Sequence, residues 1–212
     1  MKNNKPIEWL GGTFTFDFQT RESRLKPMEE HLLHLKGKRN LKFLEIGSCE
    51  GQSTLWFLNE ILTDPTSKIT CIDPHRDEDW YNNANNKIRI KTENQKTIYE
   101  TFKSNILDEY GDKVVHYRDR SANVLPELKS KFDLIYVDGN HEFYHTYMDG
   151  KLSMNLLKKS NHIMFDDYSE KKNKSSKYGE VFRAVELLKQ DNIITSQQVL
   201  HDKDVLILKN AP

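Results

Sequence analysis

Residues 43–54 read FLEIGSCEGQST, and they give the clearest indication of the fold of the chain. The apolar run that ends at Gly47 is typical of a buried β-strand. Residues 52–62 then place leucine and isoleucine at helical spacing, and Asp64 and Pro65 end that helix. The stretch therefore predicts a strand, a glycine-rich turn and a helix, which together form the first βα unit of a sheet.

The same alternation continues along the chain. Further strands are expected at residues 68–72, 113–117, 132–137, 162–165, 193–200 and 204–208, and further helices at 97–110, 121–128, 143–158 and 180–190. Strands that alternate with helices predict the α/β class. We expect a Rossmann-like, doubly wound, seven-stranded and mostly parallel sheet with one antiparallel strand and with helices on both faces. Residues 1–212 would form a single domain, with an N-terminal extension over 1–40 and the core over 41–212.

Composition narrows the class of protein. The 212 residues carry 32 Lys and Arg against 32 Asp and Glu, so the formal net charge is zero. Proteins that coat nucleic acid usually carry a basic excess, which makes a nucleic-acid partner unfavourable here. No apolar run approaches the ~18 residues of a membrane span, and residues 1–6 lack the apolar core of a secretory signal. Two cysteines make no disulfide framework, and we expect a cytoplasmic protein.

Acidic residues stand at the predicted carboxyl ends of the strands, where open α/β sheets bind their ligands. They are Glu45, Asp73, Asp119, Asp138, and the pair Asp166 and Asp167. Such an edge suits a polyol, a cation or both. The first turn has the spacing Gly47-x-x-x-Gly51, which lacks the dinucleotide fingerprint and disfavours an NAD-linked oxidoreductase. Asp73, at the end of the second strand, can accept both hydroxyls of a ribose.

Four stretches together carry a family resemblance: FLEIGSCEGQST, ITCIDPH, FDLIYVDGNH and IMFDDY. They resemble class I S-adenosyl-L-methionine (SAM)-dependent methyltransferases over about residues 41–168. The closest branch is the small-molecule O-methyltransferases, which include metal-dependent sugar and catechol enzymes. The resemblance implies that the chain is an enzyme with SAM as its cofactor.

The resemblance also implies roles for individual residues. The cofactor-binding residues would be Glu45, Gly47, Gly51, Ser53, Asp73, Arg120, Ser121 and Asp138. The first three would shape the methionine end of the pocket. Ser53 would hold the SAM carboxylate through its hydroxyl and the helix N-terminus. Asp73 would bind the ribose, and Ser121 with Arg120 would border the adenine.

Three aspartates match the cation positions of the metal-dependent members: Asp138, Asp166 and Asp167. Oxygen ligands suit Mg²⁺, which keeps open positions for a substrate. Without a cation, three neighbouring carboxylates would repel one another. Alternatively, Asp138 contacts only SAM and Asp166 caps the segment that follows it.

The predicted catalytic residues are His141 and Asp138. His141 stands three residues after Asp138, where catechol-type enzymes carry a lysine, and an imidazole with an ordinary pKa near 6.5 suits a base. The sugar enzymes place an aspartate base at the position of Asn140, which cannot accept a proton. His141 has the alternative role of a structural hydrogen-bond partner.

The resulting hypothesis is transfer of a methyl group to a hydroxyl of a small polyhydroxylated substrate, with a sugar or nucleotide-sugar favoured. Lysines 171, 172, 174 and 177 would close over an anionic substrate or form a solvated loop. Phenylalanines 14, 16 and 18 would line a substrate entrance or a homodimer edge, or pack against the core. The alternatives are a catechol-type or nucleic-acid methyltransferase of the same fold, and a SAM-binding module without catalysis.

Overall fold

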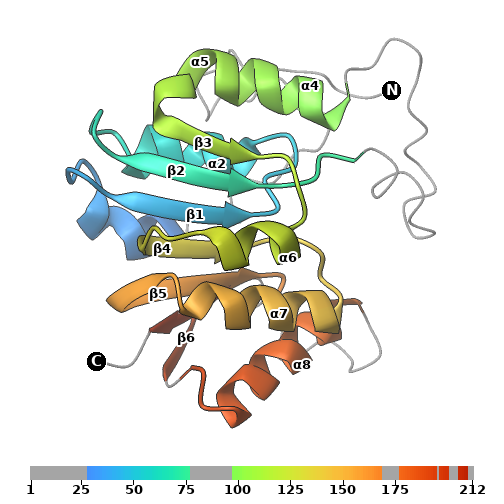
Figure 1. Cartoon of the computed structure of the whole chain (residues 1–212). Helices are drawn as coiled ribbons and strands as arrows, with labels where there is room; N and C mark the ends of the chain where they lie inside the picture. Colours follow the sequence, from blue (N-terminus) through green and yellow to red (C-terminus); the bar gives the residue numbers. More distant parts are fainter. Residues whose placement is uncertain (1–27, 77–96, 169–176, 195, 201–204, 210–212) are drawn as a thin grey trace, which may run out of the picture.

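The computed structural model describes residues 28–76, 97–168, 177–194, 196–200 and 205–209 (Figure 1). Its centre is a seven-stranded sheet with the order β3-β2-β1-β4-β5-β7-β6. The strands are β1 (Lys42–Ile46), β2 (Lys68–Ile72), β3 (Val114–Tyr117), β4 (Phe132–Val137), β5 (Leu157–Asp166), β6 (Ser196–Leu200) and β7 (Val205–Lys209). Strand β7 is antiparallel to both of its neighbours, and the pairs among β1 to β5 are all parallel. The predicted sheet is therefore confirmed.

Helices connect the strands as the sequence predicted. The helix after β1 is α2 (Gln52–Trp56), which continues as the π-helical turn η3 (Phe57–Ile61). Between β2 and β3 lie α4 (Ile98–Phe102), η4 (Lys103–Leu107), α5 (Asp108–Tyr110) and η5 (Gly111–Lys113). Later elements are α6 (Ser121–Val124), η6 (Leu125–Glu127), α7 (Phe143–Met154) and α8 (Lys177–Gln190). Residues 28–32 are helical and lead into η2 (Leu33–Leu35).

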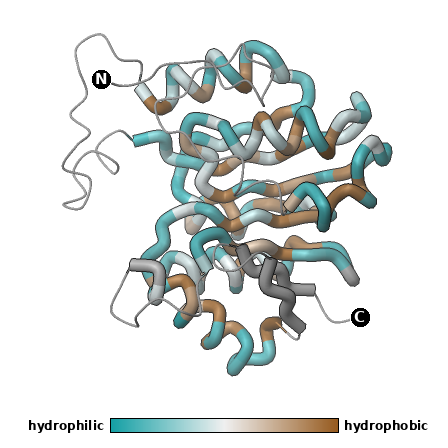
Figure 2. The backbone as a smooth tube through the Cα atoms, turned by 180° about the vertical axis from the view of Figure 1, so that it is seen from behind, coloured by the Kyte–Doolittle hydropathy of each residue, from teal (hydrophilic) through white to brown (hydrophobic). Residues whose placement is uncertain are grey.

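Two apolar cores cover the two faces of the sheet. One core joins α2, η3 and α4 with Met28 and Leu32, and the other joins α6, α7 and α8. Neighbouring residues of β5 enter opposite cores, Met164 the first and Phe165 the second, because successive side chains of a strand point to opposite faces. Figure 2 shows apolar residues along the strands, and apolar and polar residues alternating along the helices.

Some predicted boundaries are wrong. The helix expected over 180–190 begins at Lys177, which was expected in a loop, and the strand expected over 193–200 begins at Ser196. The largest difference concerns the helix before β5. The helix expected over 143–158 ends at Met154, and Leu157 already belongs to β5. Leu157 pairs with Phe132, whereas Leu134 pairs with His162, so β5 carries an irregularity between these two pairs. The apolar residues at 156 and 157 continued the helical pattern, and no glycine or proline marks the change from helix to strand.

Some predicted features lie outside the described residues. These are the phenylalanines at 14, 16 and 18, the lysines at 171, 172 and 174, and the side chain of Lys177. Within the described ranges, the structure contains no helix with both the length and the apolar character that crossing a bilayer requires.

Candidate functional site

The turns after β1 and β4 touch at the carboxyl edge of the sheet. Gly47 has a φ of 89°, and a Cβ built on it would lie 2.1 Å from the carbonyl oxygen of Asp138. The amide of Gly47 donates to Ile72 (2.9 Å), and the amide of Asp138 donates to Ile46 (2.8 Å). Because Gly47 has no side chain, the turn after β1 can approach the backbone of Asp138 closely.

Gly51 has a related role one turn later. It is the residue before α2, with a φ of 88°, and a Cβ there would lie 2.3 Å from Cγ1 of Ile106. The glycine thus allows the start of α2 to approach η4. Both predicted cofactor glycines are required by the protein's own packing, whatever they bind.

Glu45 is fully buried beneath this turn. Its carboxylate accepts hydrogen bonds from the hydroxyls of Ser53 (2.5 Å) and Thr54 and from the Cys71 thiol (3.7 Å). Burial raises the pKa of Glu45 to about 7, and the three donors oppose that rise. The Ser53 hydroxyl, predicted to hold a ligand carboxylate, donates here to a protein carboxylate and fixes the first turn of α2.

Asp73 links the end of β2 to the same turn. Its Oδ2 accepts from the amide of Cys49 (2.8 Å), and its Oδ1 accepts from the amide of His75 (2.6 Å). The residue is 7% exposed. Its carboxylate is therefore held in one orientation at the edge between β1 and β2, where the sequence placed a ribose acceptor.

A pair of histidines, the buried His75 and the half-buried His116, lies beside Asp73 and was missed by the sequence analysis as a pair. The Nε2 atoms of His75 and His116 are 3.0 Å apart, and Phe102 packs against both rings. Burial lowers the pKa of His75 to about 3 and that of His116 to about 4, so both rings are neutral near pH 7. Their contact joins β2 to β3, and only tertiary pairing could have revealed it.

Ser121 and Arg120 follow β3. Arg120 is exposed and precedes α6, whereas Ser121 is partly buried and hydrogen-bonds Asp149 of α7. Asp149 is 4% exposed, and burial raises its pKa to about 6. This carboxylate, which the sequence analysis did not single out, ties the start of α6 to α7.

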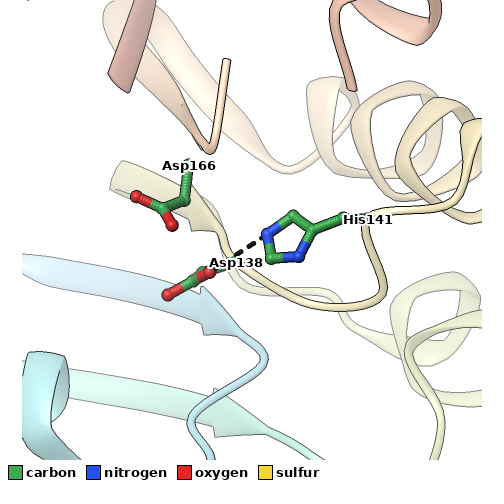
Figure 3. A group of neighbouring side chains, drawn as sticks. All are labelled: Asp138, His141 and Asp166. Atoms are coloured by element: carbon green, nitrogen blue, oxygen red, sulfur yellow. Dashed lines mark ion pairs between the residues drawn. The ribbon is translucent and has the colours of Figure 1, made fainter. Parts of the chain in front are cut away.

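Three side chains with metal-binding atoms converge beyond β4 and β5. Asp138, His141 and Asp166 each place one such atom within 4.8 Å of the other two (Figure 3). His141 Nε2 lies 3.3 Å from Oδ1 of Asp138. Oδ2 of Asp167 is instead 3.9 Å from the other ring nitrogen, Nδ1 of His141. Asp167 has a φ of 54°, so the backbone turns sharply between the two neighbouring aspartates.

Tyr136 of β4 contacts one member of this group, Asp166. The tyrosine is 3% exposed, and its hydroxyl hydrogen-bonds Asp166. Burial raises the pKa of Tyr136 well above its usual value, and the negative charges of Asp138 and Asp166 raise it further. The tyrosine therefore stays protonated and orients the Asp166 carboxylate as a donor.

A cavity of about 300 Å³ lies elsewhere, between η6 and the end of α7. Its lining includes Leu125 of η6, together with Lys131 and Leu156, which directly precede β4 and β5. It contains none of the predicted site residues.

The family follows from a comparison with known sequences. The family described as "Methyltransferase domain" matches residues 44–168, which run from β1 through the end of β5 to Tyr168. The chain belongs to this methyltransferase family. The identification made from the four sequence motifs is thereby confirmed.

A curated relative of this chain is itself uncharacterized and gives no information on function. The chain is 26% identical over 167 residues to the uncharacterized protein R132 of Acanthamoeba polyphaga mimivirus. The match covers 76% of this chain and 63% of that protein, so the chain spans less than two thirds of the relative's length.

Solved structures share the methyltransferase fold. An O-methyltransferase from Bacillus cereus in complex with S-adenosylhomocysteine (SAH) is 14% identical, with a TM-score of 0.59 over 91% of this chain and 83% of that one. The O-methyltransferase TomG from Streptomyces achromogenes, involved in tomaymycin synthesis and solved with SAM, is 20% identical, with a TM-score of 0.59 over 92% and 83%. At these identities the likeness establishes the fold alone.

Proposed function

We propose that this methyltransferase-family chain uses SAM to methylate a hydroxyl of a small polyhydroxylated molecule, with the help of a divalent cation. The observation that carries the proposal is the convergence of Asp138, His141 and Asp166 on the sheet edge that also holds Gly47 and Asp73. A cofactor cradle and a cation-binding group therefore share one edge.

The cofactor would lie along the ends of β1 to β4. Asp73 would accept the ribose hydroxyls, because its carboxylate is already fixed by two backbone amides. Gly47 and Gly51 would give the methionine end access to the backbone, with Glu45 and Ser53 holding that turn in place. Ser121, with Arg120 beside it, would border the adenine. Bound SAM would supply an electrophilic methyl group.

The cation would be held beside the cofactor. Asp138 and Asp166 would provide two ligands, and either Asp167 or His141 would provide the third. Their donor chemistry fits a divalent ion, which would lower the pKa of a substrate hydroxyl and favour its deprotonation. A vicinal diol could contact the same ion through both hydroxyls.

The acceptor class follows from this chemistry. A hydroxylated substrate matches a cation held at two carboxylates, and a sugar or nucleotide-sugar offers vicinal hydroxyls. We favour it over a catechol because the side chains that converge here are two carboxylates and an imidazole, whereas a catechol ring would need an apolar pocket.

The test is a methyl-transfer assay with labelled SAM and a panel of sugars, nucleotide-sugars, catechols and RNA. We expect transfer to a diol that stops when EDTA is added and resumes with excess divalent cation. Transfer to RNA, or transfer that is indifferent to EDTA, would contradict the corresponding part of the proposal.

A further inference from the structure

The three metal-binding atoms that meet at the site come from two carboxylates and one imidazole. We infer that His141 is itself a ligand of the cation, together with Asp138 and Asp166, and that Asp167 supports His141 from behind. This inference rests on the proposed function only for the presence of a cation. It changes both the ligand set and the kind of metal ion expected.

The distances favour His141 over Asp167. Ligand atoms that lie ~2.1 Å from one ion are at most ~4.2 Å apart. The atoms of Asp138, His141 and Asp166 already lie within 4.8 Å of one another, so shifts of a few tenths of an ångström would bring them around one ion. In Figure 3 one ring nitrogen of His141 faces both carboxylates. The part of the chain that the structure describes contains no such grouping with Asp167.

Asp167 lies near the ring nitrogen of His141 that does not face Asp138. Its Oδ2 lies 3.9 Å from Nδ1 of His141, while Nε2 of the same ring faces Asp138 at 3.3 Å. Histidines that bind metals usually donate their second ring N–H to a carboxylate or carbonyl, which fixes the ring and its tautomer. A small approach of Asp167 would complete such a carboxylate–histidine–metal arrangement.

The other two ligands have supports of their own. Tyr136 hydrogen-bonds Asp166 from the buried side of β4. The backbone of Asp138 is held by Ile46 and by its close contact with Gly47. Each of the three proposed ligands is therefore oriented by a second group, as functional metal sites require.

The donor set selects the metal. Sites built only from oxygen suit Mg²⁺, whereas an imidazole ligand shifts the preference toward first-row transition ions such as Mn²⁺, Fe²⁺ or Zn²⁺. A histidine bound to the ion through Nε2 has no free nitrogen there to accept a substrate proton. His141 would then act as a ligand and not as the general base.

The test measures metal binding on the full chain, separately from methyl transfer. Calorimetric titration should show Mn²⁺ binding about tenfold or more tightly than Mg²⁺. Pulsed electron paramagnetic resonance of the Mn²⁺-loaded protein should show coupling to a ¹⁴N nucleus. His141→Gln should remove that coupling and weaken Mn²⁺ binding by about tenfold or more. The coupling should remain in Asp167→Asn.

A matched control is His145→Gln, the same substitution at a partly exposed histidine of α7, which should leave Mn²⁺ binding and the coupling unchanged. If the wild-type protein binds Mn²⁺ without nitrogen coupling, the inference is wrong and the three aspartates remain the candidate ligands. This outcome is measured on the wild type alone and does not depend on how a variant folds. If neither Mn²⁺ nor Mg²⁺ binds while SAH still does, the inference and the cation both fail, but the proposed cofactor stands.

Discussion

Replacing Glu45 by glutamine should change how the stability of the protein depends on pH. Glu45 is fully buried, and its pKa is raised from 4.5 to about 7. A carboxyl group whose pKa is raised by folding contributes stability that is fully present below its unfolded pKa and is lost as the pH rises through its folded pKa. For Glu45 this window runs from about pH 4.5 to about pH 7.

The size of the effect follows from the shift. A rise of the pKa from 4.5 to about 7 corresponds to about 3 kcal/mol at full ionisation. Part of this loss has already occurred at pH 5, so about 2–3 kcal/mol should be lost between pH 5 and pH 8. Glutamine does not ionise, and Glu45→Gln should lack this component of the pH dependence.

Urea unfolding at pH 5 and pH 8, followed by tryptophan fluorescence and circular dichroism, measures the effect. The free energy of unfolding of the wild type minus that of Glu45→Gln should fall by about 2–3 kcal/mol between the two pH values. Glu127→Gln, at an exposed glutamate, should show no such change. A wild-type-minus-variant difference that stays constant from pH 5 to pH 8 would show that folding does not raise the pKa of Glu45.

Two further substitutions test the turns at the site. Gly47→Ala should lower the free energy of unfolding by about 2–3 kcal/mol or more, because its φ is 89° and the added Cβ meets the Asp138 carbonyl. Gly111→Ala, where φ is −49° and nothing lies within 4 Å of the added Cβ, should be neutral or slightly stabilising by urea unfolding. An equal loss of unfolding free energy in both variants would contradict a special role for the backbone of Gly47. Asp73→Asn should weaken SAH binding by about 10- to 100-fold, as measured by calorimetry, because a charged acceptor for the ribose is lost. The exposed control Asp112→Asn should bind normally, and an unchanged affinity in Asp73→Asn would remove that residue from the cofactor site.

The sequence was sufficient to predict the sheet because local residue patterns indicate each strand and helix. Apolar runs, helical spacing and turn residues alternate regularly, so the order of strands and helices could be predicted. The boundary at Leu157 was missed because a leucine at the end of a helix and one at the start of a buried strand look alike in sequence. The pairing of Leu157 with Phe132, which decides the matter, is a tertiary contact.

The sequence predicted which side chains gather at the sheet edge better than it predicted their contacts. Acidic residues at strand ends were expected at one edge, and Asp138 and Asp166 converge there, since the carboxyl ends of parallel strands meet at the same edge. The sequence could not show that Ser53 donates to Glu45, or that Asp149 hydrogen-bonds Ser121, because these partners are set by packing. Asp166 and Asp167 look equivalent as neighbours in sequence.

The backbone separates those two aspartates. The positive φ of Asp167 is visible only in the fold, where one carboxylate joins Asp138 and His141 and the other lies nearest the far nitrogen of that ring. The sequence therefore predicted a three-aspartate set, whereas the geometry favours an imidazole as the third ligand.

The most direct test of the central claim, that this sheet edge binds SAM, is calorimetric titration of the full chain with SAH in the presence of EDTA. One SAH molecule should bind per chain, and binding should be weakened in Asp73→Asn and retained in His141→Gln. Absence of SAH binding by the wild type, with and without added Mn²⁺, would contradict that claim.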